Sequence, residues 1–166
     1  MENKFTELCQ VSVIVRDREK IMQNMKEVFG VEPDLVAKTV LDENSMYYGK
    51  KGNYSAELIF YRFAGVEIEF VVPLGGESIW QDFLDEHGEG LHHVLFNVDS
   101  YDEAVAQMES HGMPLVQSGS SIMGTPGAKW GYFDTKDKLP FIVEIKNTAE
   151  CNKKAAMEKA AQEAEK

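Results

Sequence analysis

The sequence predicts an α+β domain made of two modules that share one order of elements, βαβββ. Apolar runs with the period-2 alternation of strands recur in this order around two amphipathic helices. Both helices have similar boundary residues, since Asp17 and Ser100 stand at cap positions and Gly30 and Gly112 follow the last turns. The two runs superpose at an offset of 83 residues, as expected of a duplicated unit.

The first module occupies about residues 7–75. Its helix begins after Asp17 and keeps the helical spacing of apolar residues up to Gly30. Ala64 and Gly65 separate two alternating runs, which predicts a hairpin turn. The predicted strands are VSVIV (11–15), KTVLDE (38–43), SAELIFYRF (55–63) and VEIEFVV (66–72), the last ended by PLGGES.

The second module occupies about residues 89–147 and follows a short helix and linker predicted over 78–88. Its own helix begins after Ser100, and a loop rich in glycine, serine and proline is predicted over 118–127. The predicted strands are LHHVLFNV (91–98), MPLVQ (113–117), KWGYFDT (129–135) and FIVEIK (141–146). Together the two modules are expected to form a single domain over 7–147.

The remaining residues, 148–166, predict a helical or disordered tail. They are rich in alanine, lysine and glutamate, which favour helices, and chain ends commonly fray. A solvated terminal helix is the simpler interpretation. A docking helix for a second subunit is the alternative.

Charge and hydropathy exclude several classes of function. A net charge of −11 over 166 residues argues against binding to a nucleic-acid backbone, which needs a basic surface. No apolar run is long enough to span a membrane, and the N-terminus lacks the apolar core of a secretory signal. Cys9 and Cys151 have no metal-binding spacing and are expected to be free thiols. A cytoplasmic protein is therefore expected.

Strand alternation divides the neighbouring histidines between two faces. Along 91–98, His93 shares one face with Leu95 and Asn97. His92 points to the other face and is assigned to packing or to the surface. The two histidines are therefore not expected to serve one site.

Four polar residues occupy equivalent places in the two modules. Gln10 and His93 lie near the starts of the first strands, and Glu69 and Glu144 interrupt the last strands on their less apolar face. Each residue alone indicates little, because a strand glutamate is usually solvated and a histidine is often structural. Their symmetry favours one shared site. Oxygen donors with one imidazole suit a divalent ion such as Zn, Ni, Co, Mn or Fe(II).

The same stretches resemble the vicinal-oxygen-chelate superfamily, which includes glyoxalases, bleomycin resistance proteins and dioxygenases. The resemblance covers roughly residues 7–147, and GEGLHHVLFNVD and EFVVPL are most similar to the methylmalonyl-CoA epimerases and glyoxalases I. It implies one cupped, half-barrel-like mixed sheet with helices outside. It also implies a divalent metal ion bound by Gln10, Glu69, His93 and Glu144, and a homodimer.

The resemblance implies a metal-dependent isomerase, epimerase or glyoxalase-type lyase that moves a proton next to a carbonyl through an enediolate. Glu144 would be the base, and Glu69 would act on the opposite side of the substrate. Glu57 and Glu67 are weaker candidates for the base. A glutamine ligand is typical of the eukaryotic glyoxalase I. However, the arginine by which that enzyme holds glutathione would fall at Ile14, which argues against glutathione.

Two alternatives remain open. One is a non-enzymatic small-molecule-binding or resistance-type protein, against which Glu69 and Glu144 argue, because metal-free members lack them. The other is a dioxygenase, against which Gln10 argues, because those enzymes use two histidines and one carboxylate. The expected substrate is a small carbonyl compound or a thioester. Lys50 and Lys51 could hold the thioester's phosphates, although an exposed basic turn is the simpler interpretation.

Overall fold

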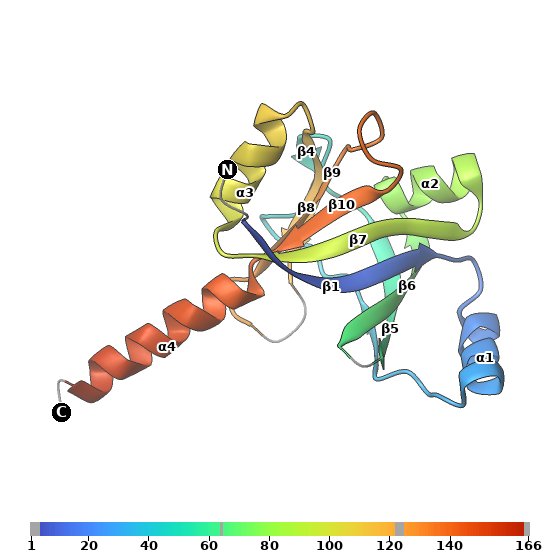
Figure 1. Ribbon diagram of the computed structural model, residues 1–166. Helices are drawn as coiled ribbons and strands as arrows, with labels where there is room; N and C mark the ends of the chain where they lie inside the picture. The colour runs from blue at the N-terminus through green and yellow to red at the C-terminus, as the bar shows by residue number, and fades with distance from the viewer. Residues whose placement is uncertain (1–3, 64, 122–124, 165–166) are drawn as a thin grey trace.

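The computed structural model describes residues 4–63, 65–121 and 125–164, in which ten strands form one mixed sheet accompanied by four helices (Figure 1). The strands are β1 (Phe5–Ile14), β2 (Leu35–Lys38), β3 (Met46–Tyr47), β4 (Lys50–Lys51), β5 (Ser55–Phe63), β6 (Val66–Gly75), β7 (Gly90–Val98), β8 (Leu115–Ser120), β9 (Lys129–Phe133) and β10 (Ile142–Lys146). The helices are α1 (Arg18–Phe29), α2 (Ile79–His87), α3 (Tyr101–Ser110) and α4 (Thr148–Ala164).

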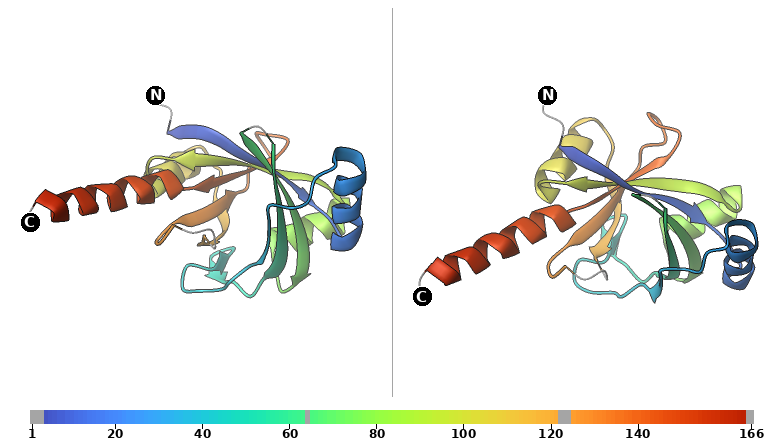
Figure 2. Two further views of the ribbon diagram at one scale, coloured as in Figure 1. Left: turned by 90° about the horizontal axis from the view of Figure 1, so that it is seen from below. Right: turned by 60° about the horizontal axis from the view of Figure 1, so that its bottom comes forward.

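The two modules meet at the centre of the sheet, where β1 and β7 pair antiparallel. Module 1 (β1–β6) contributes the strand order β2-β5-β6-β1, and module 2 (β7–β10) contributes β7-β10-β9-β8. Strands β3 and β4 of module 1 extend the sheet beyond β8. Each module thus pairs its first strand in parallel with its last strand. The sheet curls into a half-barrel (Figure 2), so the predicted α+β class and half-barrel are confirmed.

The register of the central pair repeats between the modules. Gln10 lies opposite Leu95, and Ser12 lies opposite His93. If each residue is replaced by its equivalent in the other module, Gln10 by His93 and Ser12 by Leu95, the same two pairs result. The two modules are therefore related by an approximate twofold axis, with Gln10 and His93 in equivalent positions.

Helices α1 and α3 cover the outer face of the half-barrel. Met25 of α1 packs in one core cluster with Ile59 and Phe70 of module 1, and Ala104 and Met108 of α3 pack in another with strands of module 2. These strand residues are the apolar members of alternating runs, which is why each strand buries one face under a helix. None of the helices in the described ranges has the length and apolar content needed to span a bilayer.

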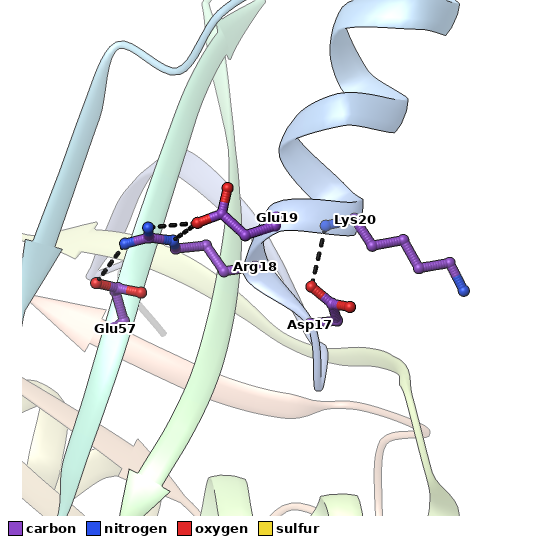
Figure 3. Close-up of polar contacts among 5 residues, drawn as sticks. All are labelled: Asp17, Arg18, Glu19, Lys20 and Glu57. Carbon is purple, nitrogen blue, oxygen red and sulfur yellow. Dashed lines mark hydrogen bonds and ion pairs between the residues drawn. The ribbon is translucent and has the colours of Figure 1, made fainter.

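The ends of α1 follow the prediction. The Asp17 carboxylate accepts a hydrogen bond from the backbone N–H of Lys20 at 3.0 Å (Figure 3). Gly30 closes the helix with φ 69°, a left-handed conformation that favours glycine. The predicted hairpin between β5 and β6 is also present, although Ala64 itself lies outside the described residues.

Helix α4 begins at Thr148 and projects away from the rest of the domain (Figure 1). Glu150 in its first turn accepts hydrogen bonds from the Tyr101 N–H at 3.2 Å and from Asn147 Nδ2 at 2.9 Å. The Ser100 side chain makes no capping bond, so the expected serine cap of α3 is replaced by a glutamate from α4.

Several predicted strand boundaries are wrong. Strand β1 begins at Phe5, six residues before the predicted start at Val11. Only Lys38 of the predicted strand 38–43 is in a strand, because β2 lies earlier and pairs with β5. Strand β6 continues through Pro73, which lies at a register shift where a missing N–H is tolerated. Strand β8 extends to Ser120, into the predicted loop.

Residues 39–45 form a strap that joins the two sides of the half-barrel. They leave β2 at one edge of the sheet and enter β3, which pairs with β8 toward the other edge. Asn44 fixes the strap: its Nδ2 donates to Ser120 Oγ at 3.0 Å, and its carbonyl accepts from Ser118 Oγ at 3.1 Å. The short β3–β4 hairpin that follows is absent from the sequence prediction.

Candidate functional site

The half-barrel contains a cavity of about 260 Å³ lined by both modules. Its apolar and aromatic lining consists mainly of Leu58, Phe60, Trp80, Leu95, Trp130 and Tyr132. Its ionisable and amide lining consists of Gln10, Arg62, Glu67, Glu69, Glu144 and Lys146. An apolar wall around a few convergent polar groups is typical of a small-molecule site.

His93 brings two carboxylates together at this cavity. Its Nε2 lies 3.0 Å from Glu144 Oε2 and 3.3 Å from Glu69 Oε2, and all three side chains are buried. The register explains the convergence. Glu69 lies beside Ser12, which is opposite His93, and Glu144 lies beside Leu95, two residues along β7 from His93.

The three contacting atoms are not satisfied by hydrogen bonds. Glu69 Oε2, His93 Nε2 and Glu144 Oε2 are buried, and within the described residues none has a hydrogen-bond partner of acceptable geometry, despite the short contacts. Such atoms often mark the place of a bound ion or water. In the described ranges, no three His, Cys, Asp or Glu side chains already stand as ligands around one point. Ion binding would therefore require the carboxylates to turn from His93 toward the ion.

The charges of these groups depend on one another. Burial lowers the pKa of His93, but Glu144 and Glu69 outweigh burial and raise that pKa to about 9. Burial raises the pKa of Glu144, with His93 opposing the shift and Glu69 adding to it. Burial, then Glu144 and Glu69, holds the pKa of Tyr132 well above its ordinary range. Near neutral pH the ion-free protein therefore holds His93 as an imidazolium between two carboxyl groups.

Gln10 lines the same cavity with its amide orientation fixed. Its Nε2 donates to Glu67 Oε1 at 2.7 Å, and Glu67 Oε2 also accepts from Arg62 Nε at 3.3 Å. A carboxylate only accepts hydrogen bonds, so the amide nitrogen must face Glu67. The amide oxygen is left as the atom of Gln10 that would bind a cation.

The rings of His92 and His93 meet, with their Nδ1 atoms 2.8 Å apart. The pairing of β1 with β7 shifts here: Ser12 is opposite His93 and Val13 is opposite Leu91, so His92 is an extra residue in a β-bulge. The prediction that alternation keeps the two histidines apart is wrong for this reason. His92 is 2% exposed, which excludes a surface role, and burial followed by the charge of His93 lowers its pKa well below the ordinary value.

Glu57 lies on the outer face of the sheet and is therefore excluded as a candidate base. Its Oε1 is 2.9 Å from Nη1 of Arg18, which also binds Glu19 (Figure 3). Its neighbour Leu58 faces the cavity, so alternation turns Glu57 away from it. Glu67 remains in the cavity lining.

The cations of the cavity are not the ones singled out in the sequence. Lys50 and Lys51 form the exposed strand β4 and are absent from the cavity lining, in agreement with an exposed basic turn. Arg62 and Lys146 line the cavity instead. Ile14 is fully buried in a core cluster.

Of the four predicted site residues, Gln10, Glu69 and Glu144 line the cavity, and His93 lies behind them in contact with both glutamates. Sequence reasoning missed the contact of His92 with His93, because a bulge depends on the partner strand and leaves no mark in one strand's pattern. It also missed Trp80 of α2, which is 2% exposed and lines the cavity. The large aromatic residue at the start of a predicted helix could have indicated Trp80.

Comparison with known families gives a match over residues 9–132 to the model described as Glyoxalase/Bleomycin resistance protein/Dioxygenase superfamily. The mitochondrial methylmalonyl-CoA epimerase of Mus musculus is 25% identical over 143 residues, which are 86% of this chain and 73% of the mouse protein. The uncharacterized protein YqjC of Bacillus subtilis (strain 168) is 24% identical over 86 residues, 52% of this chain. The match spans 61% of the Bacillus protein, less than two thirds of its length.

Solved structures of methylmalonyl-CoA epimerases share the fold. The enzyme from Mycobacterium tuberculosis has a TM-score of 0.61 and 20% identity, covering 89% of this chain and 91% of that one. An epimerase in complex with methylmalonyl-CoA and NH4+ has a TM-score of 0.61 and 16% identity, covering 86% of this chain and 94% of that one. At these identities the likeness is one of fold.

Proposed function

The chain belongs to the glyoxalase/bleomycin resistance protein/dioxygenase superfamily, and we propose that it is a metal-dependent enzyme that moves a proton next to a carbonyl group. The preferred reaction is that of an epimerase or isomerase, and a glyoxalase-type lyase reaction is the second candidate. One observation carries the proposal. The buried carboxylates of Glu69 and Glu144, from equivalent strands of the two modules, converge on His93 Nε2 at a small-molecule-sized cavity.

The residues present fit a divalent ion. Gln10, Glu69, His93 and Glu144 would hold it, through three oxygen donors and one imidazole. The unsatisfied buried atoms of Glu69, His93 and Glu144 support this assignment, and two carboxylates would balance the charge of the ion. When bound, such an ion supplies Lewis acidity toward a carbonyl oxygen.

Glu144 is the proposed base. It lines the cavity, where a carboxylate oxygen that is not engaged by the ion can accept a proton from the substrate. Glu69 comes from the other module and would return or remove the proton on the opposite side of the substrate. The apolar and aromatic wall would exclude water from the reacting carbon.

An acyl thioester is the proposed substrate class. One solved structure of the same fold holds methylmalonyl-CoA, and one from Streptomyces coelicolor holds 2-nitronate-propionyl-CoA. The buried Ile14 offers no positive charge for the carboxylates of glutathione. Arg62 and Lys146 in the cavity lining suit an acidic acyl group or a phosphate.

The proposal is tested by metal analysis and proton exchange. We expect purified protein to carry stoichiometric divalent ion, or to take up Zn, Ni, Co or Mn, and then to exchange the α-proton of methylmalonyl-CoA in deuterated water. The same assay with the thiohemiacetal of methylglyoxal and glutathione distinguishes the epimerase from the lyase. Failure to bind any of these ions would contradict the enzyme and favour a ligand-binding protein of the same fold.

The Glu144→Gln substitution tests the base. We expect a loss of exchange of about 10²- to 10⁴-fold, with the fold retained by circular dichroism and the metal content measured in parallel. Glu57→Gln is the matched control, because Glu57 is also largely buried but faces α1 on the outer side. Near-normal exchange by Glu144→Gln with its ion bound would remove Glu144 as the base.

A further inference from the structure

The contact between His92 and His93 determines which nitrogen of each ring carries a proton. Their Nδ1 atoms are 2.8 Å apart, so one must donate a hydrogen bond and the other must accept it. A ring nitrogen that ligates an ion carries no proton, so with Nε2 of His93 as the ligating atom the proton of that ring is on Nδ1. A neutral imidazole has a single N–H. The Nδ1 of His92 is then the acceptor, and the Nδ1 of His93 is the donor.

This assignment leaves the Nε2 of His93 facing the candidate metal centre. Nε2 is the atom that lies 3.0 Å from Glu144 and 3.3 Å from Glu69. Only the tautomer of His93 with its proton on Nδ1 presents a lone pair at Nε2. The orientation of the ring and the tautomer that an ion needs therefore depend on the same hydrogen bond.

His92 is held firmly enough to impose this geometry. It is 2% exposed, and its ring packs edge-on against Phe83 with centroids 5.0 Å apart. The β-bulge brings its ring to that of His93, which a regular strand would not do. An apolar side chain would fill the same space, so packing alone does not explain an imidazole here.

We propose that His92 is a positioning residue for the metal centre: its Nδ1 accepts a hydrogen bond from Nδ1 of His93 and so directs Nε2 of His93 to a divalent ion. The inference rests on the proposed function, because it takes His93 as a ligand. Ligating histidines commonly donate their second N–H to a carboxylate, a carbonyl or a water. In this protein a neutral imidazole on a bulge has that role.

Zinc affinity tests the proposal without recourse to activity. The dissociation constant of Zn²⁺ is measured by competition with a chromophoric chelator for the wild type, His92→Phe and His92→Asn. We expect His92→Phe, which lacks an acceptor, to bind Zn²⁺ about 10- to 100-fold more weakly. His92→Asn should recover most of the affinity, because its amide oxygen can accept near the position of Nδ1. Equal affinity of wild type and His92→Phe would overturn the proposal.

A second measurement needs no variant, and it decides the matter if His92→Phe does not fold. Nitrogen-15 NMR of the zinc-loaded wild type should show the His93 proton on Nδ1, with a scalar coupling to Nδ1 of His92 across the hydrogen bond. A proton on Nδ1 of His92 instead would overturn the proposal.

The outcomes also separate this inference from the proposed function. A wild-type protein that binds no Zn²⁺ or other divalent ion overturns both. A wild-type protein that binds Zn²⁺ as tightly as His92→Phe overturns only the positioning role.

Discussion

His93 is a buried imidazole whose charge is set by two neighbouring carboxyl groups. In the ion-free protein we expect stability to fall as the pH rises toward alkaline values. The pKa of His93 is raised from 6.5 to about 9 in the folded protein. Its stabilising contribution is therefore fully present below about pH 6.5 and is lost as the pH rises through about 9. Denaturant unfolding with a chelator present, at several pH values, measures the change.

The control for this pH dependence is His93→Gln, which cannot carry the charge. We expect its stability to vary less over the same pH window. The same alkaline decline in His93→Gln as in the wild type would assign the effect to another group.

Gly76 is required by the turn between β6 and α2. Its φ is 76°, and a Cβ added there would lie 2.1 Å from the backbone oxygen of Asn53. Gly30 has a similar φ of 69° but open space around the same position. We expect Gly30→Ala to cost about 1 kcal/mol for the left-handed backbone and Gly76→Ala about 1–3 kcal/mol more for the clash. Equal free energies of unfolding for the two variants would contradict this account.

At the scale of elements, α4 is joined to the domain by Glu150. Its carboxylate accepts from the first N–H of α3 and from Asn147. We expect Glu150→Ala to lower the free energy of unfolding by about 1 kcal/mol, as for the loss of a helix cap. Amide hydrogen exchange should also speed up at the starts of α3 and α4. Glu150→Gln, which keeps one accepting oxygen, should show a smaller effect, and unchanged protection in Glu150→Ala would refute the capping role.

The long alternating elements could be predicted from the sequence, whereas the short and irregular ones could not. Strand β5 is predicted with both ends correct, because an apolar and aromatic run over 55–63 ends at a hairpin turn. The run 38–43 is short and holds only two adjacent apolar residues, Val40 and Leu41, and it is largely the strap, since the pairing with β5 ends at Lys38. Strands β3 and β4, of two residues each, are too short to show a period.

The same physical limits apply to the candidate site. Strand alternation and the internal repeat predict Glu69, His93 and Glu144 as site residues, because these residues follow from the order of the strands and the faces of their side chains. The residues that contact these site residues could not be predicted from the hydrophobic pattern of a single strand. His92 reaches His93 through a bulge, and Glu67 orients Gln10 through a contact between strands.

At the scale of the whole molecule, the candidate ligands join the two modules. Glu69 belongs to module 1, and His93 and Glu144 belong to module 2. Ion binding should therefore stabilise the domain as one unit, by about 4 kcal/mol when free ion is about 1,000-fold above Kd. Calorimetry with ion and then with chelator should show one transition that moves to lower temperature. Two transitions, of which only one responds to the ion, would show that the modules unfold separately.

The strap has a consequence for what can pass into the half-barrel. Residues 39–45 connect β2, which pairs with β5, to β3, which pairs with β8, so the backbone joins both sides of the half-barrel. Seven residues reach at most about 25 Å when fully stretched. The distance between the end of β2 and the start of β3 therefore has an upper bound set by chain length. Thr39 and Val40 of the strap line the cavity, so the length of this segment limits how far the two sides of the half-barrel can separate around a bound molecule.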